Sequence, residues 1–395
     1  MGNLHKKNNL VIAETVTIKK GTIQDNLGKN YDIDFVGDND DFVNISYSDN
    51  KKKTSTIKTL LSQNKNQIYD ICFINNYSYL LVGCDKGYIY VYQRKNNGKA
   101  NLLFDEVCLF KPHVDSIIQI TKLMSGHILT LCGDASAKIL KIEIDINGVL
   151  YGDKKNCEVV QTLLNEGEYS ENSAIELING NLIISQGYFI NFFKKKGNSE
   201  SINSDIEFQL TKKIFTNSDN IFFTEIDSKT IVASQIVNNS IDFYDLDNYS
   251  VIKRVDKIEF GNKKNVMCLI SKQVLAIGSN KGSIYLIDTV KKQLFYITNL
   301  NNLGKISCLK SIDKDNIIIS CFDLKSKSND VIIYKIKTDN NLEEIKIKKN
   351  VHDDTINDIK LITMSISNNK NNFANGYNVI TIGNEHKIKI VLNDE

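Results

Sequence analysis

The chain has 395 residues, of which 42% are hydrophobic and 24% are charged, and its formal net charge is +2. This composition is globular, and the length suits one large all-β domain or two ordinary domains. The nearly balanced charge gives no strong attraction to nucleic acid or to a membrane surface. Because no apolar run approaches a length of about 18 residues, the sequence predicts no transmembrane segment.

The cysteines indicate a reducing environment. Eight are scattered along the chain, and none forms a Cys-x-x-Cys pair. Several lie inside apolar strand patterns, where a free Cys behaves as a small hydrophobic residue. This usage predicts free thiols and a cytoplasmic protein rather than a disulfide framework. The eight residues are Cys72, Cys84, Cys108, Cys132, Cys157, Cys268, Cys308 and Cys321.

The N-terminal segment is too polar for a secretory signal. It carries Gly2, which N-myristoylation requires, but Lys6 stands where the pattern has Ser or Thr. Gly2 is therefore a candidate lipidation site, and an ordinary terminal segment is the alternative.

Residues 1–66 are the least regular part of the chain. Four segments have the alternation of apolar and polar side chains that is typical of strands. The last, Ile57–Leu61, stands directly before the first regular unit. The others are Leu10–Ile18, Asp32–Val36 and Phe42–Tyr47.

From residue 68 onward, one unit of short strands recurs seven times. Val266–Asp288 is the most regular copy, and its second and third strands are joined by the tight turn Ser279–Gly282. Asn280 and Gly282 are residue types suited to the positive φ that such a turn needs. Because a small sheet of this kind has two apolar faces, it needs copies of itself on either side.

One apolar position, at the end of the third strand, can be followed through all seven units. It recurs at intervals of about 43 to 57 residues, and the units show no helical periodicity. Four short strands per interval are typical of β-propeller blades. The position is occupied by Tyr92, Ile142, Phe193, Tyr244, Ile287, Tyr334 and Val391.

The last two units depart from the pattern. The sixth expands its middle turn into the polar loop Phe322–Asp330, and the seventh stretches its first turn over Met364–Tyr377. The seventh also lacks a fourth strand. Since a ring of blades must close, we expect Ile57–Leu61 to supply that strand, with Leu10–Ile18 as the alternative. If residues 10–61 form a blade of their own, the ring has eight blades instead of seven.

Three segments, Gly278–Asp288, Gly83–Gln93 and Asn238–Asp245, resemble WD40 repeats in their turn and third strand. His113 and His352 stand before first strands, where that family has its His. No Trp exists, and no unit keeps the family's complete buried set of His, Asp, Ser or Thr, and Trp.

The resemblance implies a seven-bladed WD40-like propeller over residues 54–395, preceded by an irregular extension over residues 1–53. WD40-like propellers are mostly rigid platforms, so it also implies a non-enzymatic scaffold or adaptor in a multiprotein complex. Family geometry places the turns between second and third strands on the same face as the connections to the next blade. We expect proteins or peptides to bind there. The residues expected at this face are Lys111, His113, Phe322, Asp323, Lys325, Lys327, His352 and Asp353.

Two other functions are weaker candidates. A membrane-associated or phosphoinositide-associated propeller would rest on Gly2 and on short lysine runs such as Lys194–Lys196, but these runs lie among acids, and a paired-Arg motif is absent. A propeller hydrolase would need catalytic or metal-binding spacings. The histidines show none, Asp38–Asp41 lacks the Gly and Glu of a calcium loop, and no phosphate-binding loop or nucleophile elbow occurs. The sequence therefore predicts no enzyme, no metal and no cofactor.

Overall fold

The structure, a computed structural model, describes only part of the chain. Gly2, Lys325 and Asp353 lie outside this part. The described ranges are residues 9–11, 23–24, 30–37, 43–48, 57–61, 67–74, 78–95, 103–142, 157–165, 167, 173–196, 206–218, 221–260, 266–300, 303–323, 327–337, 342–352, 355–365, 375–383 and 387–391.

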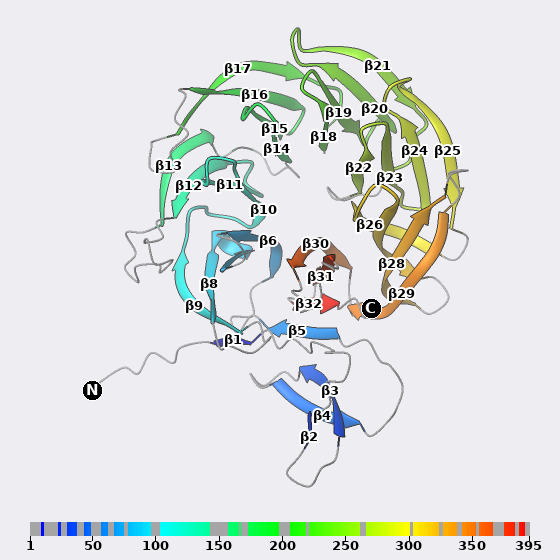
Figure 1. Ribbon diagram of the computed structural model, residues 1–395. Helices are drawn as coiled ribbons and strands as arrows, with labels where there is room; N and C mark the ends of the chain where they lie inside the picture. Colours follow the sequence, from blue (N-terminus) through cyan, green and yellow to red (C-terminus); the bar gives the residue numbers. More distant parts are fainter. Residues whose placement is uncertain are drawn as a thin grey trace.

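Short β-sheets stand side by side around a central axis, each running from the centre to the rim (Figure 1). Six of them, here called blades 1 to 6, are each built from four antiparallel strands that follow one another in sequence. A further sheet, here called the terminal sheet, combines three C-terminal strands with one N-terminal strand. The chain is therefore an all-β propeller, as the repeats predict. Within the described ranges, helical structure is limited to the 3₁₀ turn η1, Asp85–Gly87, and no helix there is long and apolar enough to cross a membrane.

The strands of each blade are given from the centre to the rim. Blade 1 contains β6 (Ile68–Ile74), β7 (Tyr79–Cys84), β8 (Ile89–Lys95) and β9 (Leu103–Phe110). Blade 2 contains β10 (Ile117–Lys122), β11 (Ile128–Cys132), β12 (Ala137–Ile142) and β13 (Cys157–Leu164). Blade 3 contains β14 (Ala174–Glu176), β15 (Leu182–Gln186), β16 (Phe189–Lys196) and β17 (Glu207–Phe215). Blade 4 contains β18 (Phe223–Asp227), β19 (Thr230–Gln235), β20 (Ser240–Asp245) and β21 (Ser250–Asp256).

Blade 5 contains β22 (Met267–Ser271), β23 (Val274–Gly278), β24 (Ser283–Asp288) and β25 (Gln293–Asn299). Blade 6 contains β26 (Leu303–Ser311), β27 (Asn316–Asp323), β28 (Ser328–Ile336) and β29 (Leu342–His352). The terminal sheet contains β30 (Ile356–Ser365), β31 (Asn375–Gly383), β32 (Lys387–Val391) and β5 (Ile57–Leu61). The remaining strands are β1 (Asn9–Val11), which pairs with β9 at the rim, and β2 (Ile23–Gln24), β3 (Asn30–Gly37) and β4 (Val43–Ser48), which form a separate sheet.

The middle strands are buried on both faces because each blade lies between two others. All six residues of β7 and all five of β11 are buried. In contrast, β21 at the rim has a single buried residue, Val255. Burial on both faces explains why the middle strands are continuous apolar runs without alternation.

A β-bulge recurs where the third strand of a blade pairs with the fourth, and it fixes the equivalent positions. The bulge falls directly before Tyr92 in blade 1 and before Leu140 in blade 2. The repeated apolar position in blade 2 is therefore Leu140, and the prediction of Ile142 is wrong by two residues. The cause is that β12 continues past the bulge to Ile142. The bulge directly precedes the predicted residue in blades 3 to 6, at Phe193, Tyr244, Ile287 and Tyr334.

Two glycines allow the turn after the second strand to touch the connection to the next blade. Gly87 has φ +78, and a Cβ there would lie 2.0 Å from the carbonyl oxygen of His113. Gly282 has φ +75, and its Cβ would lie 2.2 Å from the carbonyl oxygen of Leu303. Only glycine fits such a close approach in this backbone conformation. The positive φ expected at Gly282 is confirmed, whereas Asn280 does not have one.

These contacts define two faces of the propeller. Turns between second and third strands lie together with the connections between blades on one side, here called the loop face. Because neighbouring strands are antiparallel, the turns between first and second and between third and fourth strands lie on the opposite face.

The middle turn of blade 6 is a long hairpin rather than the polar loop expected over Phe322–Asp330. Strands β27 and β28 continue their pairing up to Asp323 opposite Ser328, and Phe322 lies opposite Asn329. The strand was not predicted because this segment is polar, although Ser328, Asn329 and Asp330 are buried.

Charged side chains link the inner strands of blade 6, the terminal sheet and blade 1. Lys360 Nζ lies 2.9 Å from Asp358 Oδ2 and 3.0 Å from Asp70 Oδ1. Lys310 Nζ lies 3.7 Å from the other oxygen of Asp358. Asp70 also accepts a 2.8 Å hydrogen bond from the backbone N–H of Ile120 in blade 2. We call Lys310, Asp358, Lys360 and Asp70 the inner charge chain.

Candidate functional site on the loop face

A pocket of about 510 Å³ opens on the loop face where blade 5, blade 6 and the terminal sheet meet. Blade 5 contributes the turn between β23 and β24, and blade 6 contributes the start of β26 and the end of its long hairpin. Its size is within the range of ligand-binding clefts. The lining residues are Asn280, Lys281, Leu303, Gly304, Lys305, Ser307, Phe322, Asn329 and Thr355.

The two lysines of the pocket differ in their surroundings. Lys281 Nζ lies 2.9 Å from Glu259 Oε1, and the hydrogen bond from Lys281 to Glu259 raises the pKa of Lys281. Lys305 makes no ion pair with any residue in the described ranges, and its side chain is half-buried. The positive charge of Lys281 is therefore paired with Glu259, whereas that of Lys305 can pair with a ligand.

Three of the residues expected at this face, Lys111, Phe322 and Lys327, have exposed side chains. Phe322 lines the pocket and is 37% exposed. Lys327 is exposed at the end of the same hairpin, where it has φ 52, and Asp323 is half-buried. Lys111 is exposed on the connection from blade 1 to blade 2, with Nζ 5.1 Å above the Tyr88 ring.

The two histidines expected near this face are both buried, each with 2% of its surface exposed. His352 Nε2 lies 2.8 Å from Thr381 Oγ1. His113 Nε2 lies 2.9 Å from Thr130 Oγ1, the equivalent contact in blade 2. Both imidazoles hold a connection against a second strand, so their side chains do not reach a partner.

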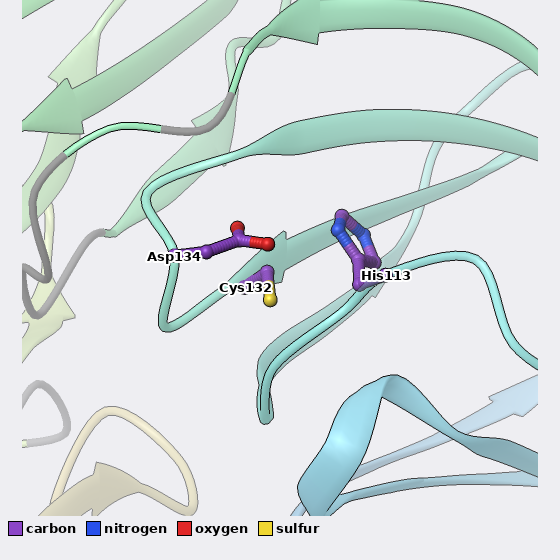
Figure 2. Close-up of side chains that lie close together, drawn as sticks. All are labelled: His113, Cys132 and Asp134. Atoms are coloured by element: carbon purple, nitrogen blue, oxygen red, sulfur yellow. The ribbon is translucent and has the colours of Figure 1, made fainter.

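Figure 2 shows His113, Cys132 and Asp134 pointing toward one another, with ligand atoms that all lie within 4.8 Å. Hydrogen bonds account for the arrangement. His113 Nδ1 lies 2.7 Å from Ser136 Oγ, and Asp134 Oδ1 accepts a 2.8 Å hydrogen bond from the Ser136 N–H.

The buried surroundings shift the titration of these three groups. Burial and the charge of Lys138 lower the pKa of His113 to about 4, so the imidazole is neutral. Burial raises the pKa of the Cys132 thiol to about 12. Burial also raises the pKa of Asp134, but hydrogen bonds from Ser136 outweigh it, and the net shift is downward. Both His113 nitrogens already contact hydroxyl groups, so hydrogen bonds explain why the three side chains lie close together.

An aromatic patch that the sequence did not predict lies on the loop face of blade 3. Tyr188 is 50% exposed and Phe215 is 64% exposed, and their ring centroids lie 6.2 Å apart. The Phe189 ring meets Phe215 edge-on at 5.6 Å, and Lys213 Nζ lies 4.0 Å above the Phe189 ring. Val237, in the corresponding turn of blade 4, is 61% exposed. The available signal was an apolar residue within a turn, Tyr188 after Gly187.

Two of the segments that resemble WD40 repeats, Asn238–Asp245 and Gly278–Asp288, end in an Asp that accepts hydrogen bonds from the backbone N–H groups after it. Asp245 Oδ1 accepts hydrogen bonds from the N–H groups of Asp247 and Asn248 at 2.7 and 3.3 Å. Asp288 Oδ1 accepts the equivalent pair from Val290 and Lys291 at 2.9 and 2.8 Å. The Asp that ends the third strand of blades 4 and 5 therefore shapes the turn into the fourth strand.

The repeats, the buried His–Thr contacts and the ring of blades define a WD40-type β-propeller fold. Sqt1 of Saccharomyces cerevisiae has a similar structure, with a TM-score of 0.59 and 13% identity over 86% of this chain and 91% of that one. U3-55K gives 0.58 with 12% identity over 85% and 98% of the two chains. The RRP9 WD40 repeats give 0.58 with 11% identity over 85% and 97%. No protein-family model and no curated protein matches the chain. At these identities the likeness shows the fold.

Proposed function

We propose that the protein is a non-enzymatic scaffold or adaptor that binds a partner protein on its loop face, as a subunit of a multiprotein complex. The observation that carries this proposal is the pocket beside the exposed ring of Phe322. Exposed aromatic rings next to a concave site are typical anchors of protein interfaces. The expected surface comprises Lys111, Phe322, Asp323, Lys325, Lys327 and Asp353, with His113 and His352 supporting it from below.

The proposed scaffold has seven blades over residues 54–395, closed by β5, with residues 1–53 as an extension. The pairing of β5 with β32, with Leu61 opposite Lys387 and Ile57 opposite Val391, supports this arrangement. Eight free thiols support a reducing, cytoplasmic location.

Affinity purification from native cells, compared between variants of the two faces, tests the proposal. Phe322→Ser and Phe215→Ser change the loop face, whereas Ile178→Ser and Val290→Ser change turns on the opposite face, where these residues are 72% and 66% exposed. We expect the loop-face variants to lose specific partners and the opposite-face variants to keep them. Equal recovery of partners by all four variants, or turnover of a substrate by the isolated chain, would refute the proposal.

A further inference from the structure

We propose that the pocket beside Phe322 binds an acidic peptide segment of the partner, with an Asp or Glu carboxylate on Lys305 and a neighbouring apolar side chain on Phe322. This inference rests on the proposed function and adds the chemistry of the partner.

The polarity of the lining selects a negatively charged group. Of the nine lining residues, Lys281 and Lys305 are cationic, and none is a carboxylate. Two of the polar lining residues are engaged within blade 6, since Ser307 Oγ lies 2.9 Å from Ser320 Oγ and Asn329 Nδ2 donates a 3.4 Å hydrogen bond to the His352 carbonyl oxygen. An Asp or Glu side chain that enters therefore meets positive charge, and no like charge, among these nine residues.

Lys305 is the residue that determines this preference. Glu259 already pairs with Lys281, 2.9 Å away. The hairpin carries two acids, of which Asp323, opposite Leu303, is half-buried. The other, Asp330, is buried and is used internally, since it accepts hydrogen bonds from Ser328 Oγ at 2.6 Å and from the Asn350 N–H at 3.0 Å. Lys305 is thus the cation that an incoming carboxylate can pair with, and its half-buried position strengthens the pair relative to one in open water.

Phe322 supplies the apolar part of the recognition. Its ring stands at the wall of the pocket with 37% of its surface exposed, and Leu303 is the second apolar side chain of the lining. An aliphatic or aromatic side chain beside the carboxylate would cover this ring. A nucleic acid fits less well, because the basic groups lining the pocket are two lysines, one of them paired, and do not form a stripe.

The test uses the purified full chain and pooled short synthetic peptides in which a fixed Leu or Phe stands beside two Asp or Glu residues. A matched pool carries Asn and Gln at those two positions. Binding is measured by fluorescence anisotropy. We expect the acidic pool to bind more tightly, and its affinity to fall as salt rises.

Three variants locate the binding. Lys305→Gln should weaken binding of the selected acidic peptide about tenfold or more, because it removes a charge-assisted contact. Phe322→Ala should weaken it by a similar factor. Lys314→Gln, an exposed lysine in the turn between β26 and β27 on the opposite face of blade 6, should leave the Kd unchanged. Unfolding curves of all three variants verify that each is folded.

Two outcomes would overturn the inference: equal binding of the acidic and amide pools, or an unchanged Kd for Lys305→Gln. A phosphoserine peptide that binds while the acidic pool does not would likewise overturn the choice of a carboxylate. If native partners are still lost from Phe322→Ser in any of these cases, the scaffold proposal stands and only the partner chemistry is wrong.

Discussion

His113 shows how one buried side chain fixes a loop that has no regular structure. Its two ring nitrogens contact Thr130 and Ser136, which lie on β11 and in the turn that follows. Its carbonyl oxygen lies so close to Gly87 that a side chain there would collide with it. The same residue thereby positions the connection between blades 1 and 2 against the turns of both. Its role follows from burial and hydrogen bonding rather than from chemistry at the surface.

The depressed pKa of His113 predicts a pH-dependent stability. The folded pKa is about 4, below the value of 6.5 expected for the unfolded chain. The stabilisation is therefore fully present above pH 6.5 and is lost as the pH falls toward 4, because the unfolded state binds the proton first. Because of this group, we expect the free energy of unfolding to be about 2 kcal/mol lower at pH 5 than at pH 7, as measured from urea unfolding curves at the two pH values. His113→Gln should lose less stability between pH 7 and pH 5. If the variant loses as much as the unchanged protein, the effect does not come from His113.

At the scale of strands, the outer strands of blades 1 and 2 are joined by a cysteine pair. Cys108 on β9 and Cys157 on β13 place their sulfur atoms 3.7 Å apart. The hydrogen bond between the two thiols lowers the pKa of Cys108, while the same contact and burial raise the pKa of Cys157. Because either thiol can be the donor of this hydrogen bond, either one can attack a small disulfide first, and the other then resolves the mixed disulfide.

Treatment with glutathione disulfide should link Cys108 to Cys157. The first exchange releases one glutathione thiol, and attack by the other cysteine of the pair releases the second, so two protein thiols become one disulfide. Non-reducing peptide mass spectrometry should detect this crosslink and no comparable link among the other six cysteines. The crosslink should raise the thermal midpoint by about 3 °C. Cys108→Ser serves as the control, and random pairing of the eight cysteines would contradict the prediction.

Most strands could be predicted from the sequence, because the middle strands are apolar on both faces and the turns recur. Two errors came from local ambiguity. In blade 2, β12 runs two residues past the bulge, and in blade 6 the paired part of the hairpin contains polar residues, of which Ser328, Asn329 and Asp330 are buried. The pocket was less accessible to prediction. Its walls come from Asn280 in a turn of blade 5, Phe322 in blade 6 and Thr355 directly before β30, and no spacing along the chain shows that they meet.

For the whole molecule, the decisive region is where the terminal sheet meets blade 6 and blade 1. The inner charge chain crosses from blade 6 through the terminal sheet to blade 1, and Lys360 lies between Asp358 and Asp70. Although burial opposes it, Asp358 and Asp70 raise the pKa of Lys360, so the side chain stays charged. Breaking such a buried pair by removing one partner is costly, since the other charge then remains unpaired. These ion pairs thus hold the inner strands of blade 6, the terminal sheet and blade 1 together. Strand β5 is the outermost strand of the same terminal sheet.

A proline in β5 tests the proposed closure against a matched control. Thr59 lies opposite Lys389 in the terminal sheet, and Leu10 lies opposite Phe104 at the rim of blade 1. Proline removes a backbone donor and is poorly tolerated within a paired strand, at a cost of about 3 kcal/mol or more. If β5 closes the ring, Thr59→Pro should lower the thermal midpoint by several degrees, measured by circular dichroism. Leu10→Pro should change it much less, because β1 is an added fifth strand on a blade that is already complete.

Deletion of residues 54–62 should go further and abolish cooperative unfolding, since the ring would then lack its last strand. Equal midpoints for the two proline variants, or a deletion variant that melts like the intact chain, would place the closing strand elsewhere.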